Sequence, residues 1–462
     1  MGICTKTLRY NLPQNKQGNL SLKLNKLPSF LGYASSRVNR FYNEDRFSMN
    51  LLKLLTTNQE KYDINGNKKY ELPILNINIF DGHGGDYVVK ELENKLSEEL
   101  SNCKPSKEKF FDILKNYEEI FKGNYWNTIY KNREEYFDKY IMNCSSKKEN
   151  LLYNGSRMIF DKRGNLIDKT ALLSDIDRLR IYQTFLNLDL DIYNQSTEEI
   201  RSGSTVSSLF LAPLNEENLD EIDNKDIFWI NNNKLMKLYI AQLGDCKVLI
   251  CDKEGIAHNL TLPHHPNSNK FENRRLSKKD DDEINKDKSV EKRQDDDFQD
   301  TIDDELISKD SFGEERFLNT FANTRSFGDY IGKPLGLTSE PDVYSYLIGS
   351  TKDIPYSETS KLQFGGDECF IVMITDGISN LMTDQEIVDF VTSTVNLRGN
   401  KKATPQFVCD EIIKYIMAIG SKQADNATCI VLRLSNWGNW PLIDRTGKSR
   451  EEKLYMNDEM RE

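Results

Sequence analysis

Acidic residues stand at the borders of apolar segments in four places along the chain. They are the pair Glu44-Asp45, Asp81, Asp376 and Asp425. If the apolar segments are strands, each strand end fixes the backbone and leaves a carboxylate at an open rim. Carboxylates that converge there form a hard, oxygen-rich site of the kind that Mg²⁺ and Mn²⁺ prefer. Two such ions can bridge a water molecule, lower its pKa and direct it at phosphorus.

Each acidic position taken alone has a simpler interpretation. Asp81 and Asp376 are both followed by glycine, and Asp-Gly is a common turn. Asp425-Asn426 alone is typical of a turn or a cap. The metal hypothesis therefore depends on the whole ordered set.

One histidine and two arginines accompany the acidic residues. His83 is one of four histidines and lies in a Gly-rich turn two residues after Asp81. An imidazole there can donate a proton to a leaving oxygen, and the alternative is a turn histidine bonded to the backbone. Arg40, four residues before Glu44, is a candidate to hold a phosphoryl group through two hydrogen bonds. Arg37 competes for that role, and an ordinary salt bridge is the alternative for both arginines.

Apolar patterns predict the elements that must hold these residues. Residues 72–80 alternate apolar residues with Asn, which predicts a strand with one face in the core that stops at Asp81. Residues 30–56 predict paired strands, and Asn65-Gly66 is a hairpin signal. Further strands are expected at 203–211, 237–251 (two, around Gly244-Asp245), 369–375 and 427–434, and helices at 86–101, 383–394 and 405–419.

Residues 29–435 are expected to form one catalytic domain with two insertions. Aromatic residues recur at helical spacing in the insertion around 104–174, and 175–194 predicts a further helix. We expect these aromatic stripes to pack on the domain, with a partner-binding face as the alternative. Residues 277–310 are charged and low in complexity, which predicts a disordered surface insertion. Residues 1–28 would be an irregular N-terminal arm or transit peptide, and 436–462 a C-terminal tail.

Composition excludes several classes of function. The 462 residues include 38% hydrophobic residues, enough for a packed core, and carry a net charge of -11. An acidic chain argues against nucleic-acid binding, and no apolar run approaches the roughly 20 residues of a membrane-spanning helix. The eight cysteines form no C-x-x-C pair, which favours a reducing compartment. The first acidic residue is Glu44, and such a basic start suits a mitochondrial transit peptide or a basic surface arm.

Taken in order, the short motifs of the chain resemble those of the 2C-type metal-dependent protein phosphatases, the PPM family. The match spans residues 30–434 with interruptions. The motifs are Arg40-Phe41-Tyr42-Asn43-Glu44-Asp45, Phe80-Asp81-Gly82-His83-Gly84-Gly85, Ser202-Gly203-Ser204-Thr205-Val206, Gly244-Asp245-Cys246, Leu260-Thr261 through Arg275-Leu276, Asn323-Thr324-Arg325-Ser326-Phe327-Gly328-Asp329, Thr375-Asp376-Gly377 and Asp425-Asn426-Ala427-Thr428.

The resemblance implies a role for each matching residue. The two metals, Mn²⁺ or Mg²⁺, would be held by Asp81, the Gly82 carbonyl, Asp376 and Asp425, with Glu44 and Asp45 beside them. His83 resembles the general acid and Arg40 the phosphate-binding arginine, while Asp245 with Asp376 resembles a weaker third metal site. The implied fold is α+β, a sandwich of two mostly antiparallel sheets flanked by helices.

The implied reaction is hydrolysis of phosphoserine or phosphothreonine in phosphoprotein substrates by a metal-activated water. We expect a monomer without nucleic-acid partners or a transmembrane segment. Two alternatives are an inert module that binds a partner through the 104–200 helices, and a hydrolase of small phosphate esters. The presence of every metal carboxylate argues against the inert module.

The chain departs from the family pattern in three places. Pro263 stands where an Asp is usual, a charged insertion follows Arg275-Leu276, and the gap from Asp81 to Gly203 is long. These departures affect the substrate surface and leave the metal cluster intact. Residues 31–40 and 436–441 resemble a fungal mitochondrial branch of the family, which favours a mitochondrial location, with the cytoplasm as the alternative.

Overall fold

The computed structural model contains two large antiparallel β-sheets. It describes residues 3–5, 7–11, 19–23, 26–54, 72–142, 152–154, 158–160, 173–196, 200–213, 228–231, 235–266, 269, 272, 275–276, 307–309, 315–318, 320–352, 359 and 362–459. The seven-stranded sheet has the order β1 (Ile3–Thr5), β5 (Arg46–Leu54), β6 (Leu72–His83), β9 (Gly203–Pro213), β10 (Leu235–Leu243) and β16 (Asp342–Gly349), with β15 (Phe327–Gly328) also paired to β9. The five-stranded sheet has the order β12 (Ala257–Asn259), β11 (Lys247–Cys251), β17 (Phe370–Ile374), β18 (Ala427–Arg433) and β4 (Leu31–Ser36).

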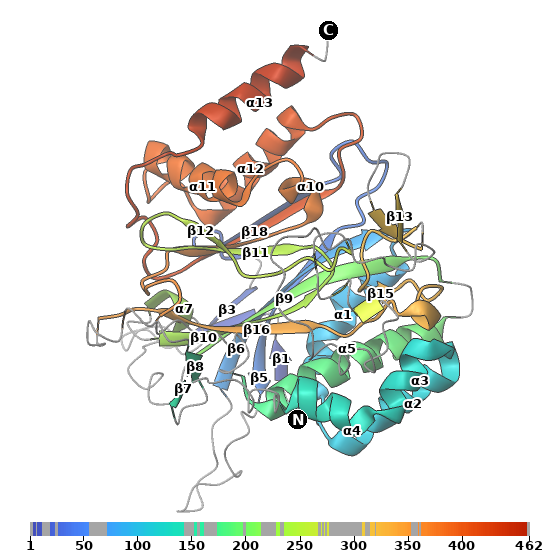
Figure 1. Ribbon diagram of the computed structural model, residues 1–462. Helices are drawn as coiled ribbons and strands as arrows, with labels where there is room; N and C mark the ends of the chain where they lie inside the picture. Colours follow the sequence, from blue (N-terminus) through green and yellow to red (C-terminus); the bar gives the residue numbers. More distant parts are fainter. Residues whose placement is uncertain are drawn as a thin grey trace, which may run out of the picture.

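The two sheets face each other, and helices cover their outer faces (Figure 1). Apolar residues from both sheets, such as Ile77, Leu209, Ile371 and Ile430, form one buried cluster between them. The helices α10 (Asp376–Ser379), α11 (Asp384–Arg398), α12 (Pro405–Ile419) and α13 (Gly447–Glu459) lie on the side of the five-stranded sheet. The helices α1 (Tyr87–Asn102), α2 (Lys107–Phe121), α3 (Gly123–Lys131), α4 (Arg133–Tyr136) and α5 (Asp175–Gln195) lie on the side of the other sheet. The expected α+β sandwich is therefore confirmed.

Strand β6 carries Asp81 out of the core and differs from its prediction. It continues through Asp81 and Gly82 to His83, because its neighbour β9 pairs with it as far as Gly203. Both of its faces are buried, so the expectation of a single core face was wrong. The polar face is satisfied internally, since Asn76 and Asn78 exchange side-chain hydrogen bonds and both also bind Ser97 of α1. A buried polar network of this kind has to be fully paired, and here it fixes α1 against the strand.

The helical insertion packs on the domain, as the aromatic spacing indicates. Tyr117 of α2 and Trp126 of α3 are fully buried. The Tyr117 hydroxyl donates to Asp189 of α5 at 2.7 Å, and Asp189 forms an ion pair of 3.1 Å with Lys333, both side chains being inaccessible to solvent. Trp126 Nε1 donates to the Lys333 carbonyl at 3.0 Å. Core packing therefore accounts for these aromatic residues.

Several expectations for the chain ends and insertions need correction. Residues 1–28 are not irregular throughout, because β1 pairs with β5, and β2 (Thr7–Asn11) pairs with β3 (Asn19–Lys23). The strands in 30–56 do not pair with each other, since β4 joins β18 and β5 joins β6. The charged insertion ends in β13 (Ile307–Lys309), which pairs with β14 (Glu315–Phe317), while 277–306 and the Asn65-Gly66 signal lie outside the described residues.

The remaining short elements complete the described structure. They are the hairpin β7 (Leu152–Asn154) and β8 (Met158–Phe160), the helix α7 (Phe228–Asn231), the π-helical turn η2 (Phe137–Ile141) and the 3-10 turn η5 (Lys333–Leu335). The C-terminal tail is part of the fold, since Trp437 and Trp440 are buried against Phe370 of β17. Among the described helices, none is long and apolar enough to cross a membrane.

A buried carboxyl between the two sheets gives a prediction about stability and pH. Glu368, 1% exposed, accepts a hydrogen bond of 2.7 Å from the Gly349 amide, and burial raises its pKa to about 7. Because the folded-state pKa lies above the unfolded one, the contribution of Glu368 is favourable below about pH 4.5 and is lost as the pH rises through 7. The measurement is urea unfolding of the wild type and of Glu368→Gln at pH 5 and at pH 8. From pH 5 to pH 8, the free energy of unfolding of Glu368→Gln should rise by on the order of 2 kcal/mol relative to that of the wild type.

The matched control has the opposite sign. Burial works against ionisation of Glu386, but its hydrogen bonds with Lys453, the Thr383 amide and Ser449 lower its pKa to about 2. Its contribution is therefore present above about pH 4.5 and is lost as the pH falls towards 2. Glu386→Gln should be less stable than the wild type at pH 8. An identical pH response of the two variants would contradict the assignment.

Candidate active site

The ends of three strands meet at Asp45. Its side chain, 3% exposed, accepts hydrogen bonds at Oδ2 from Thr375 Oγ1 at 2.9 Å and from Thr428 Oγ1 at 2.7 Å. Thr375 directly follows β17, Thr428 lies at the start of β18, and Asp45 directly precedes β5. Asp45 therefore joins the two sheets at the point where the acidic residues of both converge.

The loop before β5 is fixed to the turn before β18. Arg40 Nη2 lies 2.7 Å from Asp425 Oδ2, and the Glu44 amide donates to Asn426 Oδ1 at 2.8 Å. Glu44 Oε1 in turn accepts a hydrogen bond of 2.7 Å from the Gly85 amide, in the turn after β6. The structure thus brings Arg40, Glu44 and Asp425 together, as the sequence predicts.

Glycine is required after Asp376 because two backbones approach closely there. A Cβ atom on Gly377 would lie 1.9 Å from the Asn426 carbonyl oxygen, and one on Gly82 would lie 2.6 Å from the Glu44 carbonyl oxygen. Any larger residue would push the segment of Asp376 away from that of Asp425. The two Asp-Gly pairs of the sequence are therefore sites of close packing as well as turns.

The carboxylates gathered here repel one another. Burial raises the pKa of Asp81 well above its usual value, and the charges of Asp376 and Asp45 raise it further. Burial raises the pKa of Asp376 to about 7, with Asp245 and Asp425 adding to the effect. Burial also raises the pKa of Asp45 to about 7, against its two threonine hydrogen bonds, which lower it. Protein surrounds Asp81 and Asp376 on most sides, yet both keep partial contact with solvent.

These residues suit a hard divalent cation. Within the described residues, no three His, Cys, Asp or Glu side chains have the geometry to hold a metal ion as they are placed. However, Asp81 and Asp376 share a side-chain hydrogen bond, and Asp45 Oδ1 is buried without a hydrogen-bond partner in the described structure. The strand ends hold the carboxylates near one another, and a change of rotamer would bring their oxygens around an ion, because side chains change rotamer more easily than strand ends move. Carboxylate oxygens that repel one another fit Mg²⁺ or Mn²⁺.

His83 is oriented by an aspartate. Its Nε2 lies 2.8 Å and 3.0 Å from the two carboxylate oxygens of Asp329, which is 5% exposed and has a φ of 50°. Ser326 Oγ donates to the same carboxylate at 2.5 Å. Burial lowers the pKa of His83, but the charge and hydrogen bond of Asp329 outweigh it, so that the pKa is raised overall. Because Nε2 donates to Asp329, Nδ1 is the nitrogen left to donate a proton elsewhere.

Arg37 contacts the backbone of its own loop. Its Nη1 donates to the Arg40 carbonyl at 2.5 Å and so braces the loop that carries Arg40. The expectation that Arg37 binds a phosphoryl group stays a prediction.

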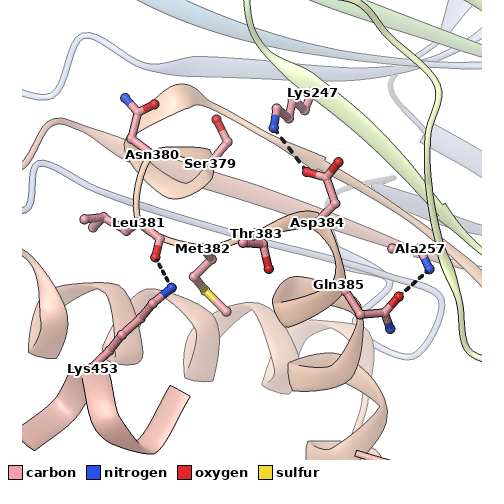
Figure 2. Close-up of a pocket in the computed structure, with 10 residues that line it drawn as sticks. All are labelled: Lys247, Ala257, Ser379, Asn380, Leu381, Met382, Thr383, Asp384, Gln385 and Lys453. Carbon is pink, nitrogen blue, oxygen red and sulfur yellow. Dashed lines mark hydrogen bonds and ion pairs between the residues drawn. The ribbon is translucent and has the colours of Figure 1, made fainter. Parts of the chain in front are cut away.

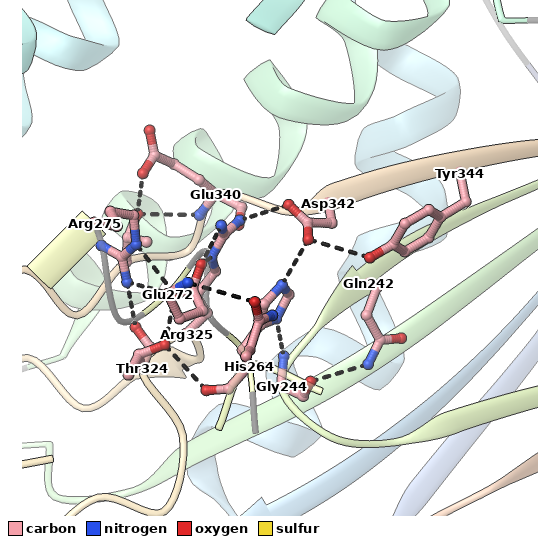
Figure 3. Close-up of polar contacts among 12 residues, drawn as sticks. Gln242, Gly244, His264, Glu272, Arg275, Thr324, Arg325, Glu340, Asp342 and Tyr344 are labelled. Carbon is pink, nitrogen blue, oxygen red and sulfur yellow. Dashed lines mark hydrogen bonds and ion pairs between the residues drawn. The ribbon is translucent and has the colours of Figure 1, made fainter. Parts of the chain in front are cut away.

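His264 binds the turn that carries Asp245 through the backbone of Gly244 (Figure 3). The Gly244 amide donates to His264 Nδ1 at 2.9 Å, and His264 Nε2 lies 3.1 Å from Asp342 Oδ2. Because His264 Nδ1 accepts a hydrogen bond, Nε2 carries the ring's proton and donates a hydrogen bond to Asp342. The His264 side chain is inaccessible to solvent. The buried His264 ring, hydrogen-bonded on both nitrogens, therefore fixes the orientation of Gly244, which directly precedes Asp245.

A buried glutamate extends this network towards the helical insertion (Figure 3). Glu272 binds Arg275 at 2.8 Å and Arg325 at 2.5 Å, and these two positive charges hold its pKa well below the usual range although burial opposes them. Arg325 also binds Asp342 at 3.0 Å and the Glu340 carbonyl at 2.9 Å.

The carboxylate of Glu340 accepts hydrogen bonds from the hydroxyls of Tyr125 and Tyr136, both in the insertion. The insertion is therefore connected to the turn of Asp245 by an unbroken series of polar contacts.

A cavity of about 580 Å³ opens beside the segment that follows Asp376 (Figure 2). It is lined by residues 379–385 with Lys247, Ala257 and Lys453, and by none of the residues predicted for the site. Lys247 Nζ lies 3.1 Å from Asp384 Oδ1, and Lys453 Nζ donates to the Leu381 carbonyl at 2.9 Å. Because both lysines already bind protein groups, we place the candidate active site at the carboxylate cluster.

Some residues of this site received no role from the sequence. They are Asp329, Thr375, Asn426 and Thr428. Each belongs to one of the short motifs, which was the only available signal. Their partners lie far away in the chain, so their roles depend on the tertiary fold.

A family model, curated relatives and a solved structure are similar to this chain. The family model described as "Protein phosphatase 2C" matches residues 145–425, more than half of the chain. Protein phosphatase 2C homolog 4 of Schizosaccharomyces pombe is 27% identical over 453 residues, which cover 96% of this chain and 90% of that protein. The mitochondrial protein phosphatase 1K of Xenopus laevis is 27% identical over 203 residues, 44% of this chain and 41% of that protein. A solved serine-threonine phosphatase 2C from Toxoplasma gondii gives a TM-score of 0.46 at 12% identity, over 94% of this chain and 99% of that chain.

The contact between His83 and Asp329 predicts a shift that nuclear magnetic resonance can measure. Replacing Asp329 by Asn removes the negative charge and the hydrogen bond that raise the His83 pKa, so we expect that pKa to fall. The measurement is a titration of the ring resonances of the four histidines, with His83 assigned through a His83→Gln variant. Asp252→Asn is the control, because Asp252 contacts a different ring, that of His258 at 2.8 Å, and its replacement should leave the His83 pKa unchanged. An unchanged His83 pKa in Asp329→Asn would contradict the pairing.

Proposed function

The chain belongs to the protein phosphatase 2C family, and we propose that it hydrolyses phosphoserine and phosphothreonine in proteins at a site that holds two Mn²⁺ or Mg²⁺ ions. The observation that supports this most is the convergence of Asp45, Asp81 and Asp376 at strand ends, where burial and the charges of neighbouring carboxylates raise the pKa of each. Buried carboxylates that lie close together cost free energy unless their charge is compensated, and divalent cations can compensate it.

The residues that would hold the two ions are Asp81, the Gly82 carbonyl, Asp376 and Asp425, with Glu44 and Asp45 beside them. When bound, such ions offset the negative charge of the phosphate and lower the pKa of a bound water molecule. Asp245, whose charge acts on both Asp81 and Asp376, would serve a weaker third ion. Thr375 and Thr428 fix the rotamer of Asp45 and so keep its unpaired oxygen in place.

Arg40 is the phosphate-binding residue of the proposal. Its guanidinium is half-exposed and already lies beside Asp425, so a phosphoryl group at the carboxylate cluster is within its reach. A guanidinium presents parallel N–H groups that match two phosphate oxygens. Arg37 keeps the Arg40 loop in shape through its hydrogen bond to the backbone.

His83 is the proton donor of the proposal. In the reaction, a water oxygen bonds to phosphorus as the bond between phosphorus and the serine or threonine oxygen breaks, and the leaving oxygen takes a proton from His83 Nδ1. The attacking water leaves one proton on the phosphate product and gives up the other, which restores the proton on His83. Asp329 accepts from Nε2, holds the ring in one orientation and favours the protonated imidazolium, which can donate at Nδ1. The arrangement needs no covalent intermediate on the enzyme.

A metal-dependent assay tests the proposal. We expect hydrolysis of a phosphothreonine peptide with Mn²⁺, loss of activity with EDTA, and a fall of at least about 100-fold in kcat for Asp376→Asn, because one of the ion-holding carboxylates is neutralised. Calorimetric titration with Mn²⁺ should show weaker binding to the same variant.

The control is Asp384→Asn, which removes a nearby acidic side chain from an ion pair with Lys247 outside the cluster. It should keep both activity and Mn²⁺ binding. Wild-type activity that is no higher than that of Asp376→Asn would sink the proposal.

A mitochondrial location and a monomeric state complete the proposal. The basic stretch before Glu44 and the mitochondrial name of the Xenopus relative support the location. Replacing Lys6, Arg9 and Lys16 by Gln should abolish co-localisation of a fluorescent fusion with mitochondria, because such targeting depends on basic residues. Replacing the exposed Lys401 and Lys402 should not. Equal distribution of both variants would argue against a mitochondrial signal.

A further inference from the structure

Two adjacent aromatic residues project from the protein surface next to Arg40. Phe41 is 93% exposed and Tyr42 is 81% exposed. Single exposed apolar residues are common and need no explanation. Two consecutive, almost completely exposed aromatic rings beside a candidate catalytic arginine are a different case, because each ring presents a large apolar area to water.

The loop that carries the two rings is rigid. The Asn426 side chain donates to the Arg37 carbonyl at 3.2 Å and to the Tyr42 carbonyl at 2.9 Å. Val38, buried to 9% exposure, has a φ of 46°, which a β-branched residue adopts only when its surroundings hold it there. The Arg40 amide also donates to the Arg37 carbonyl at 2.9 Å. The two aromatic rings are thus exposed from a fixed backbone.

The position of the rings defines what they can touch. Consecutive Cα atoms lie about 3.8 Å apart, so Phe41 adjoins Arg40 and Tyr42 is within about 8 Å of Glu44. An extended peptide advances about 3.3 Å per residue. If Arg40 holds the phosphate of such a peptide, the peptide residues one to three positions from the phosphorylated residue therefore lie beside the rings of Phe41 and Tyr42.

We propose that Phe41 and Tyr42 form a docking surface for apolar side chains that flank the phosphorylated residue of a protein substrate. The inference rests on the proposed function and deepens it, because it names a feature of the substrate. The occupant is a phosphopeptide segment, since the charges of Arg37 and Arg40 beside the rings complement a phosphate. A rigid aromatic pair loses little conformational freedom on binding, which is the property of an interaction hot spot.

The test compares substrates with and without a peptide. We expect the double variant Phe41→Ala/Tyr42→Ala to lower kcat/KM at least about tenfold for a phosphothreonine peptide with flanking Leu residues. It should leave hydrolysis of p-nitrophenyl phosphate, which has no flanking residues, within about twofold. For a matched peptide with flanking Ser residues, wild type and variant should differ little. The more conservative Phe41→Leu/Tyr42→Phe should recover most of the loss.

Controls separate this inference from the proposed function. Leu397→Ala removes an apolar side chain of similar exposure, 90%, near the end of α11 and should not change peptide selectivity. Arg40→Ala should lower activity on peptides and p-nitrophenyl phosphate alike. A wild-type protein inactive on both substrate classes would refute the proposed function itself.

Three outcomes would overturn the docking surface while the proposed function stands. They are an unchanged preference for flanking Leu in the double variant, an equal loss on peptide and p-nitrophenyl phosphate, and selective loss of binding to anionic phospholipid vesicles with peptide kinetics unchanged.

Discussion

Repulsion between carboxylates is the constraint on which the rest of this structure depends. Two like charges about 4 Å apart repel by about 4 kcal/mol at an effective dielectric constant near 20. Asp45, Asp81 and Asp376 come from different strands, and each would move away from the others if its backbone allowed it. The two sheets prevent this, because the carboxylates stand at or directly beside strand ends that are hydrogen-bonded to their neighbours. Glycine at positions 82 and 377 then allows the backbones to approach.

The helical insertion supports the site from the side of the seven-stranded sheet. Asp189 accepts hydrogen bonds from Tyr117 and from the Gly328 amide, directly before the residue that orients His83. Tyr125 and Tyr136 reach Glu340, next to the network of Arg325 and His264. Burying the charge of Lys333 is tolerable only with Asp189 beside it. The insertion therefore packs against the elements that carry the candidate site, although it contributes no candidate catalytic residue.

The sequence predicted strand ends and helices best where a local pattern of residue types is compatible with few structures. The Asp-Gly pair after the apolar run at 369–375 predicted the end of β17, and helical spacing predicted α1 and α5 to within a few residues. It failed where tertiary partners decide. Strand β6 looked one-sided because Asn76 and Asn78 are polar, yet both are buried and paired with Ser97. Asp329 received no role because nothing local to it reveals that His83, 246 positions away, is its partner.

The pairing of β4 with β18 determines when the site can form during synthesis. These strands are neighbours in the five-stranded sheet, yet Ser36 and Ala427 are 391 positions apart in the sequence (427 − 36). The contacts of Arg40, Glu44 and Asp45 with residues 425–428 span the same separation. Contacts between distant segments close late in folding. A nascent chain on the ribosome therefore carries an incomplete carboxylate cluster until the segment of β18 has also emerged.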